Sequence, residues 1–338
     1  LHRVDRRQRQ MCIRDRLAAL LLASAMPAAA ASDPLASLKA QFALPDEQVN
    51  FVEAKLVVDQ LIDPSTDTAA IRRDLDRWER AVRSNVPAGS NGRQVLDALL
   101  KTLYEPGSWN DGKPFRYDLD DPLGKQPANK RLATYLATRK GNCVSMPILA
   151  AILGQRLGLT ITLSTAPEHI LAKFADDSLH MWINVEATGG GYKRDDSYIR
   201  DTGISQTALE NEIYLRPLRP HEAVGVIANT LMEHYAREGN GAALMEVADL
   251  ALIANPKDTV AMIWKANASY LLIQSRYQRK YPNAADIPKE LVSDFQRLSV
   301  ENLAWFERAE ALGWAQKTPE QDAAYLQSIQ NEKARRGQ

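Results

Sequence analysis

Residues 139–158, RKGNCVSMPILAAILGQRLG, are followed directly by residues 159–188, LTITLSTAPEHILAKFADDSLHMWINVEAT. The first stretch repeats apolar residues at helical spacing and ends at a glycine, which predicts a helix over 143–157. The second has the composition of three β-strands, predicted at 159–165, 169–174 and 180–188. A helix followed by consecutive strands predicts an α+β fold in which the helix packs on a small antiparallel sheet, rather than a doubly wound parallel sheet.

The third predicted strand alternates between polar and apolar side chains. Trp182, Asn184 and Glu186 share one face, whereas Met181, Ile183, Val185 and Ala187 share the other. The three glycines at 189–191 follow this strand without the strand–turn–helix context of a phosphate loop. They therefore predict a turn of the chain.

Cys143 is the sharpest chemical signal in the sequence. It lies at the start of the predicted helix, just after Gly141-Asn142 and near Arg139 and Lys140, and helix N-termini and nearby cations both stabilise a thiolate. A thiol nucleophile also needs a base and a group that orients the base. His169 opens the second predicted strand, and either Glu186 or Asn184 on the third could orient its imidazole. A buried cysteine and a structural histidine are the competing interpretation.

Three motifs resemble the transglutaminase-like superfamily, which shares its thiol-first architecture with papain-type proteases: KGNCVSMPIL, PEHILAKF and WINVEATGGG. The resemblance covers about residues 45–200 and is strongest to a bacterial branch with an N-terminal helical region and C-terminal tetratricopeptide-like helices. It implies Cys143 as nucleophile and His169 as base. The third family position, usually Asp before Pro-Thr, falls on Glu186 before Ala187-Thr188, and Asn184 stays the alternative third member.

The same resemblance implies acyl transfer through a thioester, with amide hydrolysis, deamidation or transamidation as the outcome and a protein or peptide as the substrate. The Cys143 backbone N–H is a candidate oxyanion donor, and Asn129 or Gln126 is a candidate for the second donor. Trp182 either lines the cleft or covers the sheet. No cofactor is implied, and no CxxC or HExxH spacing predicts a metal site.

Toward the N-terminus, residues 33–105 carry helical patterns whose apolar stripes need a partner surface. The predicted helices run from Asp46 to Leu61, from Thr68 to Val82, and from an Asn91 cap to Leu103. The predicted transglutaminase-like core spans 106–217. Its first part, within residues 105–127, is rich in Gly, Pro and Asp and has neither helical nor strand periodicity. This composition predicts a functional loop that lies across a cleft. A helix over 129–140 is predicted next.

Toward the C-terminus, residues 221–338 are helical again. A helix, a glycine turn, an Ala-rich helix and then Asn-Pro resemble a tetratricopeptide repeat, a motif that offers a docking surface for a protein partner. A plain helical bundle is the alternative. The predicted helices are 221–238, 241–254, 259–276 and 287–312.

The N-terminal residues predict export. An Arg-rich lead is followed at 17–31 by LAALLLASAMPAAAA, the pattern of a signal peptide with cleavage near Ala30 or Ala31. Residues 1–16 look like an N-terminal extension that is not native to the protein, and we predict no structural element for them. Because Cys12 would leave with this segment, Cys143 is expected to be the one thiol of a periplasmic or extracellular protein. No later window predicts a transmembrane segment in the mature chain.

Composition limits the remaining function classes. The 338 residues include 42 basic and 42 acidic side chains, and this neutral balance gives no electrostatic footprint for nucleic acid. Removing residues 1–31 leaves 36 basic and 40 acidic residues. Three hypotheses therefore stay open: an exported cysteine-dependent acyl-transfer enzyme, a catalytically inactive transglutaminase-like module that binds proteins through its helical repeats, and a purely structural protein in which the cysteine is packing.

Overall fold

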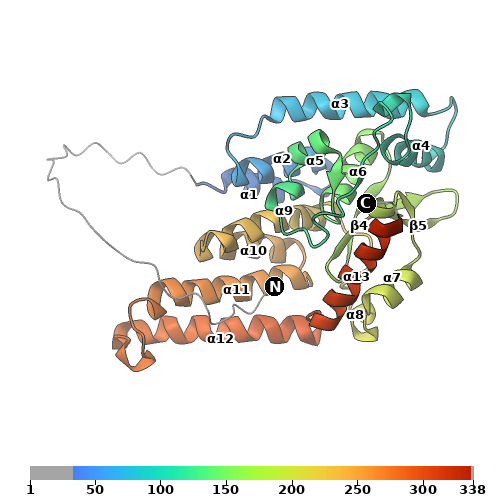
Figure 1. The fold of residues 1–338 in the computed structure, drawn as a ribbon. Helices are drawn as coiled ribbons and strands as arrows, with labels where there is room; N and C mark the ends of the chain where they lie inside the picture. Colours follow the sequence, from blue (N-terminus) through green and yellow to red (C-terminus); the bar gives the residue numbers. More distant parts are fainter. Residues whose placement is uncertain (1–32, 336–338) are drawn as a thin grey trace, which may run out of the picture.

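The structure, a computed structural model, describes residues 33–335 (Figure 1). The predicted extension and signal peptide at 1–31 lie outside the described residues. Among residues 33–335, no helix is both long and apolar enough to cross a membrane.

Helix α6 (Ser145–Arg156) forms the centre of the fold. All of its residues from Ser145 to Gly154 are buried, so it is apolar on every side rather than amphipathic. It packs against three N-terminal helices, against α5 and against strands β3 and β4. Gly154 allows the close approach to the sheet, because a Cβ there would lie 2.8 Å from the Ile161 side chain.

The main sheet is antiparallel, with the strand order β3-β4-β5-β6. Its strands are β3 (Ile161–Ala166), β4 (His169–Asp176), β5 (Met181–Glu186) and β6 (Gly191–Tyr192). The predicted α+β fold, with a central helix on a small antiparallel sheet, is confirmed. The predicted glycine turn is also present, since Gly190 adopts the left-handed φ of 68° between β5 and β6.

Two predictions for the segments before Cys143 were wrong: one helix is shorter than predicted, and one segment predicted as a loop contains a strand. The predicted helix 129–140 is shorter, because α5 (Leu132–Thr138) ends where Arg139 takes the left-handed φ of 56°. The next two residues form β2 (Lys140–Gly141), which pairs in parallel with β1 (Arg116–Tyr117). The segment 105–127, expected to lack regular structure, thus contributes a strand whose two-residue length is too short for any periodicity to reveal.

In the part of the chain that the structure describes, four α-helices precede the core: α1 (Ala36–Phe42), α2 (Phe51–Ile62), α3 (Thr68–Asn85) and α4 (Gly92–Tyr104). The predicted Asn91 cap is present and forms a reciprocal capping box with Gln94. The predicted start at Asp46 was wrong, because residues 46–48 form a 3₁₀ turn and Asn50 caps α2 instead.

Within residues 33–335, seven α-helices follow the sheet, and the first six are α7 (Asp195–Thr202), α8 (Gln206–Glu210), α9 (Pro220–Arg237), α10 (Gly241–Ala254), α11 (Thr259–Ile273) and α12 (Lys289–Ala311). Figure 1 shows α9 to α12 stacked in order, and successive members of this series pack together. A last helix, α13 (Pro319–Arg335), leaves the stack and returns toward the sheet (Figure 1).

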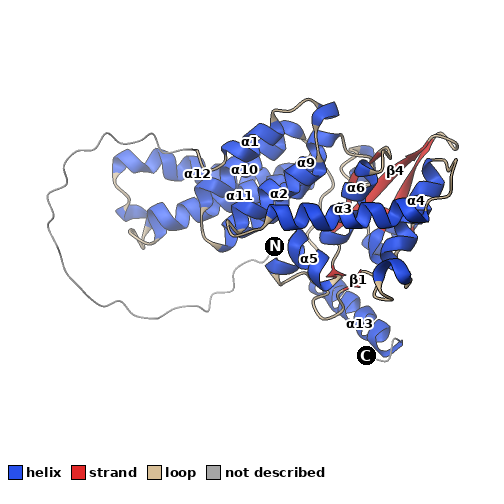
Figure 2. Cartoon of the chain, turned by 90° about the horizontal axis from the view of Figure 1, so that it is seen from above, coloured by secondary structure: helices blue, strands red, loops and turns tan. Residues whose placement is uncertain are grey.

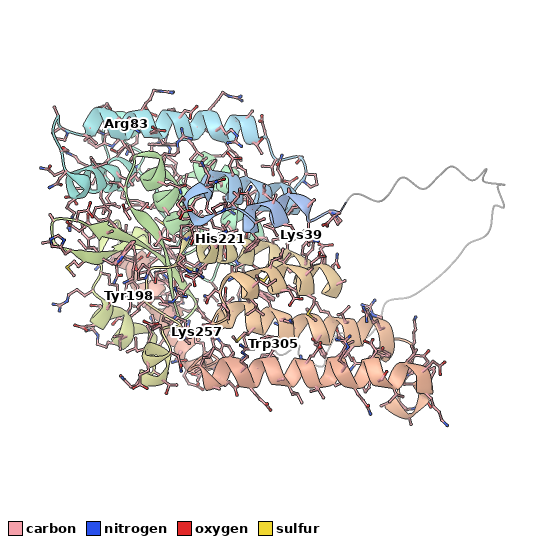
Figure 3. The ribbon with its side chains drawn as sticks, turned by 180° about the vertical axis from the view of Figure 1, so that it is seen from behind. Lys39, Arg83, Tyr198, His221, Lys257 and Trp305 are labelled. Carbon is pink, nitrogen blue, oxygen red and sulfur yellow. The ribbon has the colours of Figure 1, made fainter. Side chains whose placement is uncertain are left out.

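The helical stack and the core share one continuous set of buried side chains. Helix α9 packs on α2 and β3 as well as on α10, and its apolar residues belong to the same cluster as those of α6. Polar contacts add to this joint: His221 at the start of α9 places Nδ1 2.7 Å from Asp46 Oδ1, and Lys39 of α1 pairs with Glu246 of α10 (Figure 3).

Candidate active site

Cys143 lies in the turn between β2 and α6, two residues before the helix begins. Asn142 shapes this turn: its Oδ1 accepts hydrogen bonds from the backbone N–H groups of Val144 at 3.0 Å and Ser145 at 3.1 Å. In return, Ser145 Oγ accepts from the Asn142 N–H at 3.1 Å. The Cys143 N–H takes no part in this capping, and the residue is partly exposed. The predicted helix start at Cys143 was therefore two residues early, but the thiol does stand at a helix N-terminus.

The turn between β3 and β4 brings His169 to this thiol. Ala166 and His169 are paired across the two strands, so only Pro167 and Glu168 form the connection. Glu168 takes a left-handed φ of 54°, and its carbonyl oxygen lies 3.8 Å from Cys143 Sγ as the acceptor of the thiol. The side chains of Cys143 and His169 consequently interact.

Glu186 completes a series of three side chains. Its Oε2 lies 3.1 Å from His169 Nε2, so Nδ1 is the ring nitrogen left for the thiol. The strand register explains the contact: Ala172 is opposite Val185, which places His169 and Glu186 diagonally on the same face of β4 and β5. The thiol, the imidazole and the carboxylate thus come from three separate parts of the chain.

The Glu186 carboxylate is held by further donors that sequence reasoning missed. Tyr198 of α7 donates its hydroxyl to Oε2 at 2.5 Å (Figure 3), while Thr188 donates its N–H at 3.1 Å and its hydroxyl at 2.5 Å to Oε1. Tyr198 is buried, and its ring centre lies 5.7 Å from that of His169. Thr188 follows Glu186 closely enough to be guessed from sequence, whereas nothing local signals Tyr198.

The electrostatics of this series favour a charged imidazole and a charged carboxylate. Burial lowers the pKa of His169, but hydrogen bonds to Cys143 and Glu186 and their charges outweigh it and raise the pKa to about 9. Burial likewise raises the pKa of Glu186, but His169, Thr188 and Tyr198 lower it to about 2. At neutral pH the geometry therefore stabilises an imidazolium beside the anionic Glu186 carboxylate.

Asn184, the alternative third residue, lies apart from His169. Its Nδ2 donates to the Lys193 carbonyl at 3.0 Å and to Asp195 Oδ1 at 2.5 Å. Lys173, which faces Asn184 across the strands, lies 3.5 Å from the same Asp195 oxygen. Asn184 thus helps anchor the start of α7, and the carboxylate beside His169 is that of Glu186.

Of the two upstream residues predicted as oxyanion donors, Asn129 donates its side-chain hydrogens to other groups and Gln126 is exposed. Asn129 Nδ2 donates to Asp121 Oδ2 at 2.9 Å and to Asp118 Oδ2 at 3.3 Å, which uses both of its hydrogens. Gln126 is exposed and gives only its backbone N–H to Asp121, at 3.1 Å. Both residues therefore stabilise the loop after β1, and the Cys143 N–H stays a candidate donor.

Trp182 lies at the hairpin end of β5, opposite Ala175, and is 37% exposed. It precedes Glu186 by four residues, about 13 Å along an extended strand. The structure therefore places Trp182 away from Cys143, where it covers the end of the sheet rather than the cleft.

Two phenols from distant parts of the chain lie near the thiol and were also missed. Burial first, and then the charge of Cys143, raise the pKa of Tyr117 on β1. Burial and the same thiol raise the pKa of Tyr325 on α13, against the lowering effect of Tyr117. The two hydroxyls are 2.7 Å apart although 208 positions separate them in sequence, a contact that no local pattern could reveal.

The comparisons with known proteins give a family match. Residues 69–228 match the family described as the transglutaminase-like superfamily. The matched range runs from α3 into α9 and includes Cys143, His169 and Glu186. No curated protein and no solved structure matches the chain. Within residues 33–335, no group of three or more His, Cys, Asp or Glu side chains could hold a metal ion.

Proposed function

Because residues 69–228 form a transglutaminase-like domain, we propose that the protein is a cysteine-dependent acyl-transfer enzyme that acts on amide groups of proteins or peptides. The observation that carries the proposal is that Glu186 Oε2 lies 3.1 Å from His169 Nε2, while the same imidazole interacts with the Cys143 side chain. A cysteine that served only as packing would need neither an imidazole nor a carboxylate in line with it.

The proposed reaction has two steps. The Cys143 thiolate attacks the amide carbonyl carbon, and the oxygen that becomes negative is stabilised by the Cys143 N–H. The His169 imidazolium then gives its proton to the leaving nitrogen, so the C–N bond breaks and a thioester and a free amine result. In the second step water or another amine attacks the thioester while His169 accepts its proton, the C–S bond breaks, and an acid or a new amide leaves with the thiolate and the imidazolium restored.

Glu186 acts in this scheme by positioning. Its carboxylate holds His169 through Nε2, which keeps Nδ1 aimed at Cys143 and stabilises the imidazolium that the first step consumes. The pKa of about 2 keeps Glu186 anionic throughout the neutral range.

The first experiment compares the wild type with Cys143→Ser and His169→Ala. Candidate peptides are incubated with and without a primary amine and analysed by mass spectrometry, and iodoacetamide alkylation of Cys143 is followed against pH. We expect hydrolysed, deamidated or amine-linked peptides from the wild type only, and alkylation near neutral pH that depends on His169. A thiol that reacts only above about 8.5, whether or not His169 is present, would contradict the proposal and favour an inactive binding module.

We also propose that the protein is exported. The apolar stretch at 17–31 behind an Arg-rich lead supports this, because it matches the length and flanks of a signal peptide. N-terminal sequencing of protein made in a Gram-negative host should find a periplasmic product that begins near Ser32. A cytoplasmic product that retains residues 17–31 would contradict export without affecting the proposed chemistry.

A further inference from the structure

Helix α13 and Lys317 just before it contact two segments near Cys143, the loop after β1 and the turn before β4. On one side, the Tyr325 hydroxyl is 2.7 Å from that of Tyr117 and 3.2 Å from the Pro122 carbonyl oxygen. Figure 2 shows α13 at the outer edge of the molecule next to β1, which carries Tyr117.

Ion pairs fasten both ends of the same segment. Lys333, near the end of α13, lies 3.0 Å from Asp120 in the loop after β1. Lys317, just before the helix, lies 3.3 Å from Glu168, whose carbonyl oxygen accepts from the Cys143 thiol. The contacts thus reach from the β1 loop to the turn that precedes His169, and the thiol lies between them.

The attachment of α13 is polar and shallow. None of its residues is buried, and its half-buried positions recur at helical spacing on the face that meets the core: 322, 325, 329, 332 and 333. Exposed ion pairs of this kind contribute little to stability. By contrast, α9 to α12 bury apolar side chains against each other. Helix α13 is therefore the element that can leave the molecule at the smallest cost.

We propose that α13 is an intramolecular cover of the active site: it occupies the place where a polypeptide substrate reaches Cys143, and it must move aside before such a substrate binds. This proposal rests on the proposed function in one respect: the polypeptide that α13 keeps away from Cys143 is a substrate only if the protein is an enzyme. The surface itself, formed by Tyr117, Asp120, Pro122 and Glu168, fits a helix that carries a phenol between two cations, as this chain's own segment 317–333 does.

Alkylation of Cys143, followed on its own peptide by mass spectrometry because Cys12 is a second thiol of the chain, tests the cover without requiring catalysis. The variant Lys317→Ala/Tyr325→Ala/Lys333→Ala removes the three attachments, and Gln327→Ala is the matched control, because Gln327 bonds only to Asn331 of its own helix. Each protein is treated with iodoacetamide and with a maleimide on a polymer of protein size. We expect the triple variant to react roughly tenfold faster with the bulky reagent, a 1.4 kcal/mol shift toward the open state, and the control to match the wild type.

A second measurement uses the wild type and so does not depend on how the variant folds. Labelling Cys143 with the bulky maleimide should accelerate amide hydrogen exchange within residues 319–335, while labelling with iodoacetamide should change it less. Bulky labelling at the wild-type rate in the triple variant, or unchanged exchange in α13 after bulky labelling, would overturn the cover. Loss of peptide chemistry in every variant would instead count against the proposed function and leave the cover intact.

Discussion

At the scale of single residues, the site is defined by how completely one carboxylate is hydrogen-bonded. Glu186 replaces the shorter Asp expected from the resemblance, and the additional methylene lets its two oxygens reach His169, Tyr198 and Thr188 together. A carboxylate with this many donors is fixed in orientation and stays anionic. The imidazole is consequently held by a rigid partner rather than by a side chain that can rotate away.

The Tyr198 hydroxyl should contribute to catalysis through this positioning. Tyr198→Phe removes one of the donors that lower the pKa of Glu186, so that pKa should rise from about 2 and the acidic limb of the kcat/KM profile should move to higher pH. We expect kcat to fall about tenfold, the worth of one hydrogen bond to a charged group, with KM unchanged. Tyr192→Phe is the control, because its hydroxyl donates to a different carboxylate, Asp97. An unchanged acidic limb would show that Tyr198 is only packing.

His169 should make the folded protein less stable as the pH rises into the alkaline range. Its pKa is raised from 6.5 to about 9, so its stabilising effect is complete below pH 6.5 and disappears as pH rises through 9. Urea unfolding of the wild type and His169→Gln at pH 6 and pH 9.5 should show the stability advantage of the wild type shrinking by about 3 kcal/mol. An equal difference between the two proteins at both pH values would contradict the charged imidazole.

At the scale of elements, a buried ion pair joins α2 to the segment that leads into α5. Lys55 and Asp59 have side chains only 1% exposed, and their charged atoms are 2.6 Å apart. Lys55 also donates to the Lys130 carbonyl at 3.0 Å, and Asp59 accepts from the Leu132 N–H at 2.9 Å. These bonds position α5, which is followed by β2 and the Cys143 turn.

Breaking this pair should be costly because one charge would stay buried alone. We expect Lys55→Met to lower the free energy of unfolding by about 3–5 kcal/mol. Lys55→Met/Asp59→Asn should recover much of this loss, since the amide oxygen can still accept from Leu132. Chemical denaturation of the two variants measures the difference. A double variant as unstable as the single one would show that the cost arises from packing and not from an unpaired charge.

At the scale of the whole molecule, the site depends on a core that crosses the predicted regions. The side chains of α2, α6, α9 and α10 belong to one buried cluster, and the family match ends inside α9 rather than at a boundary between helices. Helices α9 and α10 therefore support the site through the shared core, whereas the α13 segment contacts Tyr117 and Glu168 near Cys143.

A shared core predicts that the site and the helical stack unfold together. Far-ultraviolet circular dichroism, which follows the helices, and His169-dependent alkylation of Cys143, which follows the site, should report the same urea midpoint. The control is His169→Ala, in which alkylation loses its dependence on the folded site. Loss of the alkylation signal well before the helices melt would mean that the core and the C-terminal stack are separate cooperative units.

The sequence by itself determined the α+β class, the strand order along the chain, the Asn91 cap and the placement of Cys143 at a helix start, because periodicity, capping and turn residues act over a few positions. It also proposed His169 as the base, with Glu186 or Asn184 as its partner. Only the tertiary structure shows that the carboxylate beside His169 is that of Glu186, since residues on the same strand face differ only in what lies opposite them. The tertiary structure likewise supplied Tyr198 and the Tyr117–Tyr325 contact, because packing joins residues whose separation along the chain carries no local signal.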